Sequence, residues 1–297
     1  MPASPPGRTR TARAMPRWVP RASLTSGRLG AIPSPVVAAT RLTWLLLAAL
    51  TPVFGASAFS VQHQGTGFDV YRLDRGEEQR LQFFWKRADG SPYGSIHALR
   101  DSLASLGKDL VFAVNGGIYS EQFTPLGLYI EDGRRFYQLT RGDGGGNFFL
   151  KPNGVFYVTE AGAGVVRTED YGPEGKVRHA VQSGPMLVIG GELHPRFIPG
   201  YHSQYIRNGV GVDEEGRVVF AISNAEVSFH DFGTLFRDRL HCPNALYLDG
   251  AISAMYAPEL GRFGGWPWTQ FATLIGIVRQ RPAATGDPSS RGDDPPG

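Results

Sequence analysis

Four short stretches combine glycine with a polar residue at the end of an apolar run. They are Asn115-Gly116-Gly117, Ser183-Gly184-Pro185, Arg207-Asn208-Gly209-Val210-Gly211 and Leu248-Asp249-Gly250. A polar side chain at a strand end leaves the core, and a neighbouring glycine lets the backbone approach a ligand closely. Each stretch alone is also ordinary turn composition. The four together, in this order, are what indicates a site.

Taken in order, the stretches resemble the phosphodiester glycosidase domain. That family has an Asn-Gly-Gly turn after a strand, then Ser-Gly-Pro, then an Arg followed four residues later by Gly, and finally Leu-Asp-Gly-Gly-Gly-Ser. The resemblance covers residues 68–280 and looks closest to an exported bacterial branch, through residues 147–154, 182–187 and 244–250. It implies a hydrolase that cleaves a sugar-1-phosphodiester in an envelope or extracellular glycan.

The chain departs from the family pattern directly after Asp249-Gly250. Ala251 and Ile252 stand where the family has two further glycines, and Ala254 replaces its second serine. If those glycines let the backbone approach a sugar or phosphate, Ile252 narrows the site. The alternative function is therefore a non-catalytic envelope protein that binds glycan or phosphate with the same fold.

Cleavage of a sugar C1–O bond beside a phosphodiester requires two kinds of group. One is a cation or amide nest for the phosphate, and the other is a carboxylate that activates water or attacks C1. Arg207 is the candidate for the first role, because a guanidinium can hold phosphate oxygens bidentately. Asp249 is the candidate for the second, and Asn115 could orient a sugar hydroxyl or the water. Glu226 and His230 are reserve candidates for acid–base catalysis.

The other matched positions are candidates for substrate binding: Gly116, Gly117, Ser183, Gly184, Asn208, Gly211, Gly250 and Ser253. Structural roles remain open for several candidates. Arg207 and Asp249 could form a structural ion pair. Asn115 could simply form a turn, and His230 could be a surface residue at a helix start.

Three further patterns carry weaker signals. Residues 141–147 are glycine-rich, but no helix with Lys-Ser/Thr follows, so a P-loop is excluded. His194 and His202 lack the spacing of a zinc site, and we expect no metal ion or cofactor. Trp266 and Trp268 could stack on a sugar ring, although packing within their loop is the more ordinary role.

Charge is distributed unevenly along the chain. Residues 1–58 contain seven of the 30 basic residues and none of the 27 acidic ones, which leaves 23 basic residues against 27 acidic ones in the remainder. Nucleic-acid binding by the folded part is therefore not expected. Residues 42–54 form an apolar run of signal-peptide length, with Ala56 and Ala58 before a cleavage point at Phe59. We expect a periplasmic or secreted protein that meets the membrane only during export; the sequence does not indicate an oligomeric state.

Residues 59–280 alternate short extended runs with turns. Strands are expected at 68–73, 81–86, 110–114, 245–248 and 271–278, and hairpins at 126–139, 148–159 and 210–223. Helices are expected at 95–106 and at 231–240, the latter capped by Asp231. This pattern predicts a single α+β domain with mainly antiparallel or mixed sheets. Residues 281–297 are expected to be a disordered tail.

Overall fold

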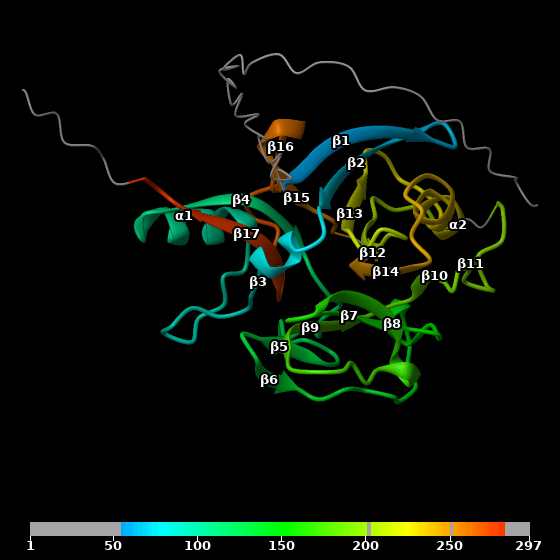
Figure 1. The fold of residues 1–297 in the computed structure, drawn as a ribbon, viewed down its shortest axis with the longest axis horizontal. Coiled ribbons are helices and arrows are strands. Elements are labelled where there is room, and N and C mark those ends of the chain that lie inside the picture. Colours follow the sequence, from blue (N-terminus) through cyan, green and yellow to red (C-terminus); the bar gives the residue numbers. More distant parts are fainter. Residues whose placement is uncertain (1–54, 201–202, 250–251, 283–297) are drawn as a thin grey trace, which may run out of the picture. The chain divides into compact units, whose positions relative to one another are not determined.

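A computed structural model describes residues 55–200, 203–249 and 252–282, which all fall within one compact unit (Figure 1). The predicted signal segment, Gly250 and His202 lie outside the described residues, as does the tail from residue 283. Within the described part of the chain, strands pair antiparallel throughout. The predicted α+β class is confirmed.

The described strands form three sheets. The first has seven strands in the order β1-β2-β13-β12-β14-β10-β11. Its strands are β1 (Ala56–His63), β2 (Thr66–Leu73), β10 (Met186–Ile189), β11 (Glu192–Leu193), β12 (Asn208–Val212), β13 (Val218–Ser223) and β14 (Asn244–Asp249).

The other two sheets have five strands each, in the orders β16-β15-β4-β17-β3 and β6-β5-β9-β7-β8. The second sheet contains β3 (Leu81–Phe84), β4 (Lys108–Asn115), β15 (Met255–Ala257), β16 (Arg262–Phe263) and β17 (Leu274–Gln280). The third contains β5 (Tyr129–Glu131), β6 (Arg134–Tyr137), β7 (Gly154–Thr159), β8 (Gly162–Arg167) and β9 (Val177–Ser183).

Helices are short. The α-helices are α1 (Ile96–Ser105) and α2 (Phe229–Thr234), and α2 continues into the π-helical turn η4 (Leu235–Arg239). The 3₁₀ turns are η1 (Glu77–Arg80), η2 (Asn147–Phe149), η3 (Thr168–Asp170) and η5 (Pro258–Leu260). The Ser95 hydroxyl caps α1 by accepting from Ala98 N, and the apolar face of α1 packs in a cluster with residues of β4 and β17.

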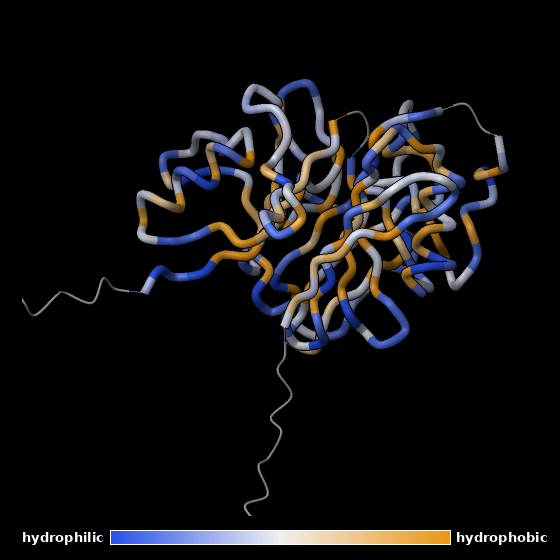
Figure 2. The backbone as a smooth tube through the Cα atoms, turned by 90° about the horizontal axis from the view of Figure 1, so that it is seen from above, coloured by the Kyte–Doolittle hydropathy of each residue, from blue (hydrophilic) through white to orange (hydrophobic). Residues whose placement is uncertain are grey.

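One large apolar cluster joins the three sheets. Tyr71 of β2 stacks on Phe112 of β4 with ring centroids 4.1 Å apart, and Phe156 of β7 contacts Phe220 of β13 edge-on. Figure 2 shows that hydrophobic stretches lie mainly toward the inside of the molecule and hydrophilic stretches mainly in its outer turns. The sheets therefore share a core, and strand ends from different sheets can meet.

One predicted strand and one predicted helix cap are wrong. Residues 148–151 do not form a strand, because Asn147–Phe149 is a 3₁₀ turn and the Asn153 amide donates to Phe148 O at 2.8 Å. Strand β7 instead pairs with β8, a strand that the sequence pattern did not predict. The second helix is capped by Ser228 rather than Asp231, since the Ser228 hydroxyl accepts from Asp231 N.

The first strand begins before residue 59, the predicted start of the domain. Strand β1 begins at Ala56 and pairs with β2 from the Ala56–Leu73 pair onward. The predicted cleavage point before Phe59 therefore falls inside β1. Cleavage there would leave five residues of the strand, 59–63, to pair with β2.

Candidate active site

The candidate site forms where β12 begins and where β14 and β4 end. A register shift between Asn208 and Gly209 places Asn208 opposite Asp249, while Gly209 lies opposite Tyr247. Such an irregularity re-aims a side chain at a strand end. Asn115, the last residue of β4, reaches the same point from the second sheet.

Asn208 holds the centre of this cluster. Its amide nitrogen donates to Asn115 O at 2.8 Å and to Asn115 Oδ1 at 3.0 Å. Its Oδ1 accepts from Asp249 N at 3.2 Å and from Ser253 Oγ at 3.2 Å. The buried amide is therefore fully hydrogen-bonded within the protein, which indicates a positioning role rather than contact with substrate.

Asn115, the last residue of β4, makes a second set of hydrogen bonds in this cluster. Its Nδ2 donates to Asp249 Oδ2 at 2.7 Å and to Ile252 O at 3.2 Å. Its Oδ1 also accepts from Ala254 N at 2.8 Å. The short hydrogen bond to a carboxylate is of the stronger, charge-assisted kind. Asn115 thus holds the Asp249 carboxylate and the backbone at Ile252 and Ala254.

Asp249 is the charged group of the cluster and keeps 8% of its surface exposed. The pKa of the nearby Tyr119 is raised to about 12. Burial of the phenol is the larger cause, and the negative charge of Asp249 is the smaller one. The Tyr119 hydroxyl donates to Gln270 O at 2.9 Å. Tyr119 therefore remains a neutral phenol beside the carboxylate. No sequence motif marked it as part of the site.

Arg207 points away from this cluster into a buried aromatic cage. Its nitrogens donate to Val227 O at 2.8 Å, Tyr247 Oη at 3.0 Å and Ser203 O at 2.8 Å. The guanidinium carbon lies 3.6 Å from the Phe229 ring centroid, a cation–π contact. Burial lowers the pKa of Arg207. Its side chain is fully buried, so direct bidentate binding of phosphate is not supported.

The alternative ion pair between Arg207 and Asp249 is also not observed. Within residues 55–200, 203–249 and 252–282, the hydrogen bonds of Arg207 go to neutral groups. The two residues are instead linked through Tyr247, which accepts from Arg207 and lies two residues before Asp249 on β14. Arg207 therefore supports the strand that carries Asp249.

Comparison with known proteins places this geometry in a family. The family model for phosphodiester glycosidases matches residues 108–284, from the start of β4 past the end of β17. The protein YigE of Escherichia coli K12 is 40% identical over 206 residues, which are 69% of this chain and 79% of that protein. This chain belongs to the phosphodiester glycosidase family.

One solved structure agrees in fold with this chain. The catalytic domain of zebrafish N-acetylglucosamine-1-phosphodiester alpha-N-acetylglucosaminidase, auto-inhibited by its pro-peptide, matches with a TM-score of 0.53 and 15% identity. The match covers 77% of this chain and 84% of that one. A Burkholderia pseudomallei protein assigned as exported has a TM-score of 0.47 and 11% identity, over 71% of this chain and 74% of that one.

Four glycines of the phosphodiester glycosidase motifs are buried and closely packed. A Cβ at Gly116 or Gly117 would lie 2.7 Å from Ile275 or 2.5 Å from Val181, respectively. At Gly184 it would lie 2.6 Å from Asn153 Cβ, and at Gly211 it would lie 2.7 Å from Cys242 Sγ. Close packing therefore accounts for these glycines. Their predicted direct contact with substrate is not supported.

The remaining predicted residues lie in three different settings. The Ser183 hydroxyl is buried and donates to Leu248 O at 2.8 Å, so it braces β14 just before Asp249. Glu226 is exposed, next to Val227, whose carbonyl accepts from Arg207. His230 lies in the first turn of α2, with Nδ1 3.0 Å from Asp231 Oδ1. Of these, Ser183 contacts the strand of the cluster directly.

Trp266 and Trp268 do not pack into their loop, contrary to the ordinary expectation. They are 68% and 71% exposed and stack on each other with centroids 5.1 Å apart. Their loop touches the site, because a Cβ at Gly265 would lie 3.2 Å from Ala254 Cβ. Ala254 N in turn donates to Asn115 Oδ1. The loop that carries these two exposed rings therefore packs against Ala254, whose backbone is hydrogen-bonded into the cluster.

Proposed function

We propose that the protein is an exported hydrolase that cleaves the bond between sugar C1 and the oxygen of a phosphodiester in an envelope or extracellular glycan. Water supplies the new oxygen at C1, and the products are a free sugar and a phosphate monoester. The observation that carries this proposal is the buried network around Asp249, in which two amides from different sheets position one carboxylate.

Asp249 is the group that attacks C1 or removes a proton from water. Asn115 orients its carboxylate through the 2.7 Å hydrogen bond, and Asn208 fixes the backbone at the same residue. A departing phosphate monoester is a good leaving group, so strong protonation of the leaving oxygen is not required. This explains how one carboxylate can suffice where other glycosidases use two.

The stacked tryptophans supply a surface for the sugar part of the substrate. A pyranose ring presents C–H groups that pack against the negative face of an aromatic ring. Two large exposed aromatic side chains beside a polar cluster are typical of a ligand surface rather than of a plain loop. We assign Trp266 and Trp268 to sugar binding on this ground.

Export is the second part of the proposal. Residues 42–54 and the alanines at 56 and 58 support it. In the described part of the chain, no helix combines the length and apolarity needed to cross a membrane. N-terminal sequencing of the protein recovered from the periplasm or medium should begin at Phe59, and a chain that retains Met1 would refute export.

The activity is tested by incubating the purified protein with a panel of sugar-1-phosphodiesters and measuring free sugar. Sugar release that disappears in Asp249→Asn supports the hydrolase. Ile252 is 44% exposed beside the cluster, which favours the alternative of a non-catalytic glycan-binding protein if its side chain blocks the site. Binding of the panel without release of sugar would establish that alternative.

A further inference from the structure

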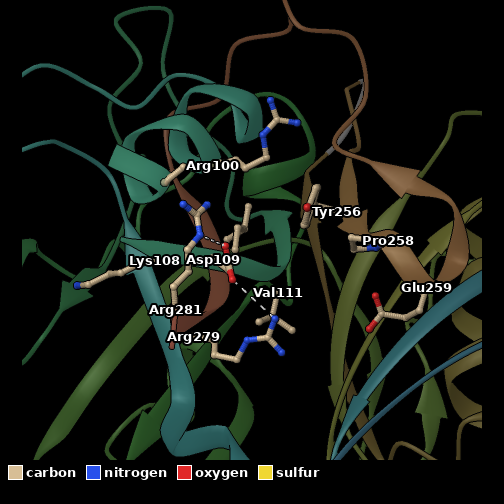
Figure 3. A pocket seen from close by; sticks show the side chains of 11 residues that line it. Arg100, Lys108, Asp109, Val111, Tyr256, Pro258, Glu259, Arg279 and Arg281 are labelled. Atoms are coloured by element: carbon tan, nitrogen blue, oxygen red, sulfur yellow. Dashed lines mark hydrogen bonds and ion pairs between the residues drawn. The ribbon is translucent and has the colours of Figure 1, made fainter. Parts of the chain in front are cut away.

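A polar cavity lies at the other end of β4 from Asn115. It encloses about 510 Å³, a volume within the range of ligand sites. Arg100 of α1, Lys108 of β4, and Arg279 and Arg281 at and beyond the end of β17 bring four cations to it (Figure 3). Tyr256 and Glu259 form the facing wall. We call this cavity the basic groove.

The basic groove has more positive than negative charge. Its two lining carboxylates are Asp109 and Glu259, and Arg100 is paired with the adjacent Asp101, with Nη2 2.8 Å from Oδ1. Asp109 forms ion pairs with two arginines, with Arg281 Nε 2.6 Å from Oδ1 and Arg279 Nη2 3.8 Å from Oδ2 (Figure 3). Across residues 55–200, 203–249 and 252–282, Lys108 forms no ion pair.

The excess of positive charge is confined to the basic groove, because the folded domain as a whole is slightly acidic. Residues 59–282 contain 22 basic and 24 acidic residues. Four cations gathered around one cavity are therefore a segregation of charge rather than a general property of the surface. A cavity of this kind attracts an anion, and arginine and lysine side chains together suit phosphate oxygens.

Two adjacent strands connect the groove with the candidate active site. Strand β4 runs from Lys108 to Asn115, which spans roughly 23 Å at about 3.3 Å per residue. Strand β15 pairs with β4 and carries Tyr256, two residues after Ala254, which donates to Asn115. A ligand that reaches both places must be an extended chain of several units.

We infer that the basic groove binds a second phosphate of the same substrate, so that the substrate is a polymer with repeated phosphodiester links. This inference rests on the proposed function, since that function supplies the first phosphodiester at Asp249. Arg279, Arg281 and Lys108 hold the second phosphate. Binding there keeps the chain on the enzyme at a distance from the bond that is cleaved.

The test measures binding separately from hydrolysis. The probe is an oligomer of glycerol phosphate, which carries repeated phosphodiesters but no sugar C1–O bond, titrated by isothermal calorimetry. The variant is Lys108→Glu/Arg279→Glu, and the matched control is Arg134→Glu/Arg135→Glu, two exposed arginines on β6. Vesicles containing phosphatidylglycerol test whether a lipid headgroup is the ligand instead.

We expect the groove variant to weaken oligomer binding about tenfold or more at low salt, and the control variant to weaken it less than about twofold. Both should release sugar from a short monomeric sugar-1-phosphodiester at the wild-type rate. Three outcomes would refute the inference that the basic groove binds a second phosphate: equal weakening by both variants, no oligomer binding by the wild type, or binding to vesicles alone. Absence of sugar release with groove-dependent binding intact would refute the hydrolase alone.

Discussion

Asn208 on β12 and Asn115 on β4 join two sheets through a pair of hydrogen bonds, from Asn208 Nδ2 to the main-chain and side-chain oxygens of Asn115. Both bonds are buried, and Asp249 is held by both residues. The position of the carboxylate thus depends on contacts between sheets rather than on β14 alone. A change that loosens this pair should displace Asp249.

Replacing Asn208 with alanine should therefore cost both stability and activity. The change removes the four hydrogen bonds that the Asn208 amide makes with Asn115, Asp249 and Ser253 inside the cluster, which costs about 2 to 4 kcal/mol of unfolding free energy. Urea unfolding measures this loss. The matched control is Asn224→Ala, at an exposed asparagine, which should change stability by less than about 1 kcal/mol. Equal losses in the two variants would contradict a special role for Asn208.

Asp249→Asn should abolish sugar release while the fold persists. Removing the charge takes away the attacking or proton-accepting group, and we expect kcat to fall about a thousandfold or more. Asp238→Asn, which removes an exposed carboxylate paired with Arg237, should leave kcat within about twofold. Steady-state kinetics check both, with circular dichroism as the test of folding. An active Asp249→Asn enzyme would exclude Asp249 as the catalytic carboxylate.

Trp266→Ala/Trp268→Ala should act on binding rather than on stability. The rings are mostly exposed, so their loss removes little buried surface, and the thermal midpoint should shift by only about 1 °C. We expect KM for a glycan substrate to rise about tenfold, from loss of ring stacking worth roughly 1 to 2 kcal/mol. Leu106→Ala, another exposed apolar residue just after α1, serves as the control. An unchanged KM would remove the tryptophans from the site.

His179 should make the domain sensitive to acid. Its side chain is buried and stacks on Phe83 at 4.8 Å, and its Nδ1 accepts from Asp132 N at 3.3 Å. Burial lowers the pKa of His179 to about 4, an effect that the nearby Asp132 and Arg178 modify with opposite signs. The native state therefore prefers the neutral ring. Between the unfolded pKa of about 6.5 and the folded value, the unfolded chain binds more protons.

The stability of the wild type should consequently fall as the pH drops through this window. Between pH 7 and pH 4.5, we expect the free energy of unfolding of His179→Gln to fall by about 2 to 3 kcal/mol less than that of the wild type. The variant lacks the imidazole that the unfolded wild-type chain protonates in this range. The comparison within each pH series cancels the shared effect of the carboxylates. Urea unfolding at the two pH values is the measurement. Parallel losses in the two proteins would show that His179 is not the cause.

Local patterns were sufficient to predict much of the fold. The turn at Asp132-Gly133 has φ of +48° and +77°, as a type I′ hairpin requires, and it joins β5 to β6 as expected. Ser95 caps α1, and Ile96, Leu99 and Leu103 form its buried face. These features depend on neighbours within a few residues, which a single sequence displays directly.

The site could be predicted only in part, because its geometry depends on distant contacts. Asn115 and Asp249, two of the candidate residues, are hydrogen-bonded across 134 positions of sequence. The sequence predicted that Arg207 binds phosphate. Successive side chains of an extended chain point to opposite sides, so Arg207 points into the aromatic cage around Phe229 while Asn208 points into the cluster. Tyr119 had no local signal at all. Which side of a strand end a residue faces is set by bulges and pairing that the sequence pattern does not show.

The cluster also has a consequence for the chemical ageing of the molecule. Asn115 and Asn208 each precede glycine, and in a flexible chain such a pair deamidates when the glycine nitrogen attacks the side-chain amide. Here both amides are fully hydrogen-bonded, and Gly116 N is held by Thr273 O at 3.1 Å. Folding therefore protects the two asparagines whose conversion to aspartate would place new negative charge beside Asp249. The rate at which Asn115 and Asn208 deamidate should therefore depend on how often this region unfolds locally.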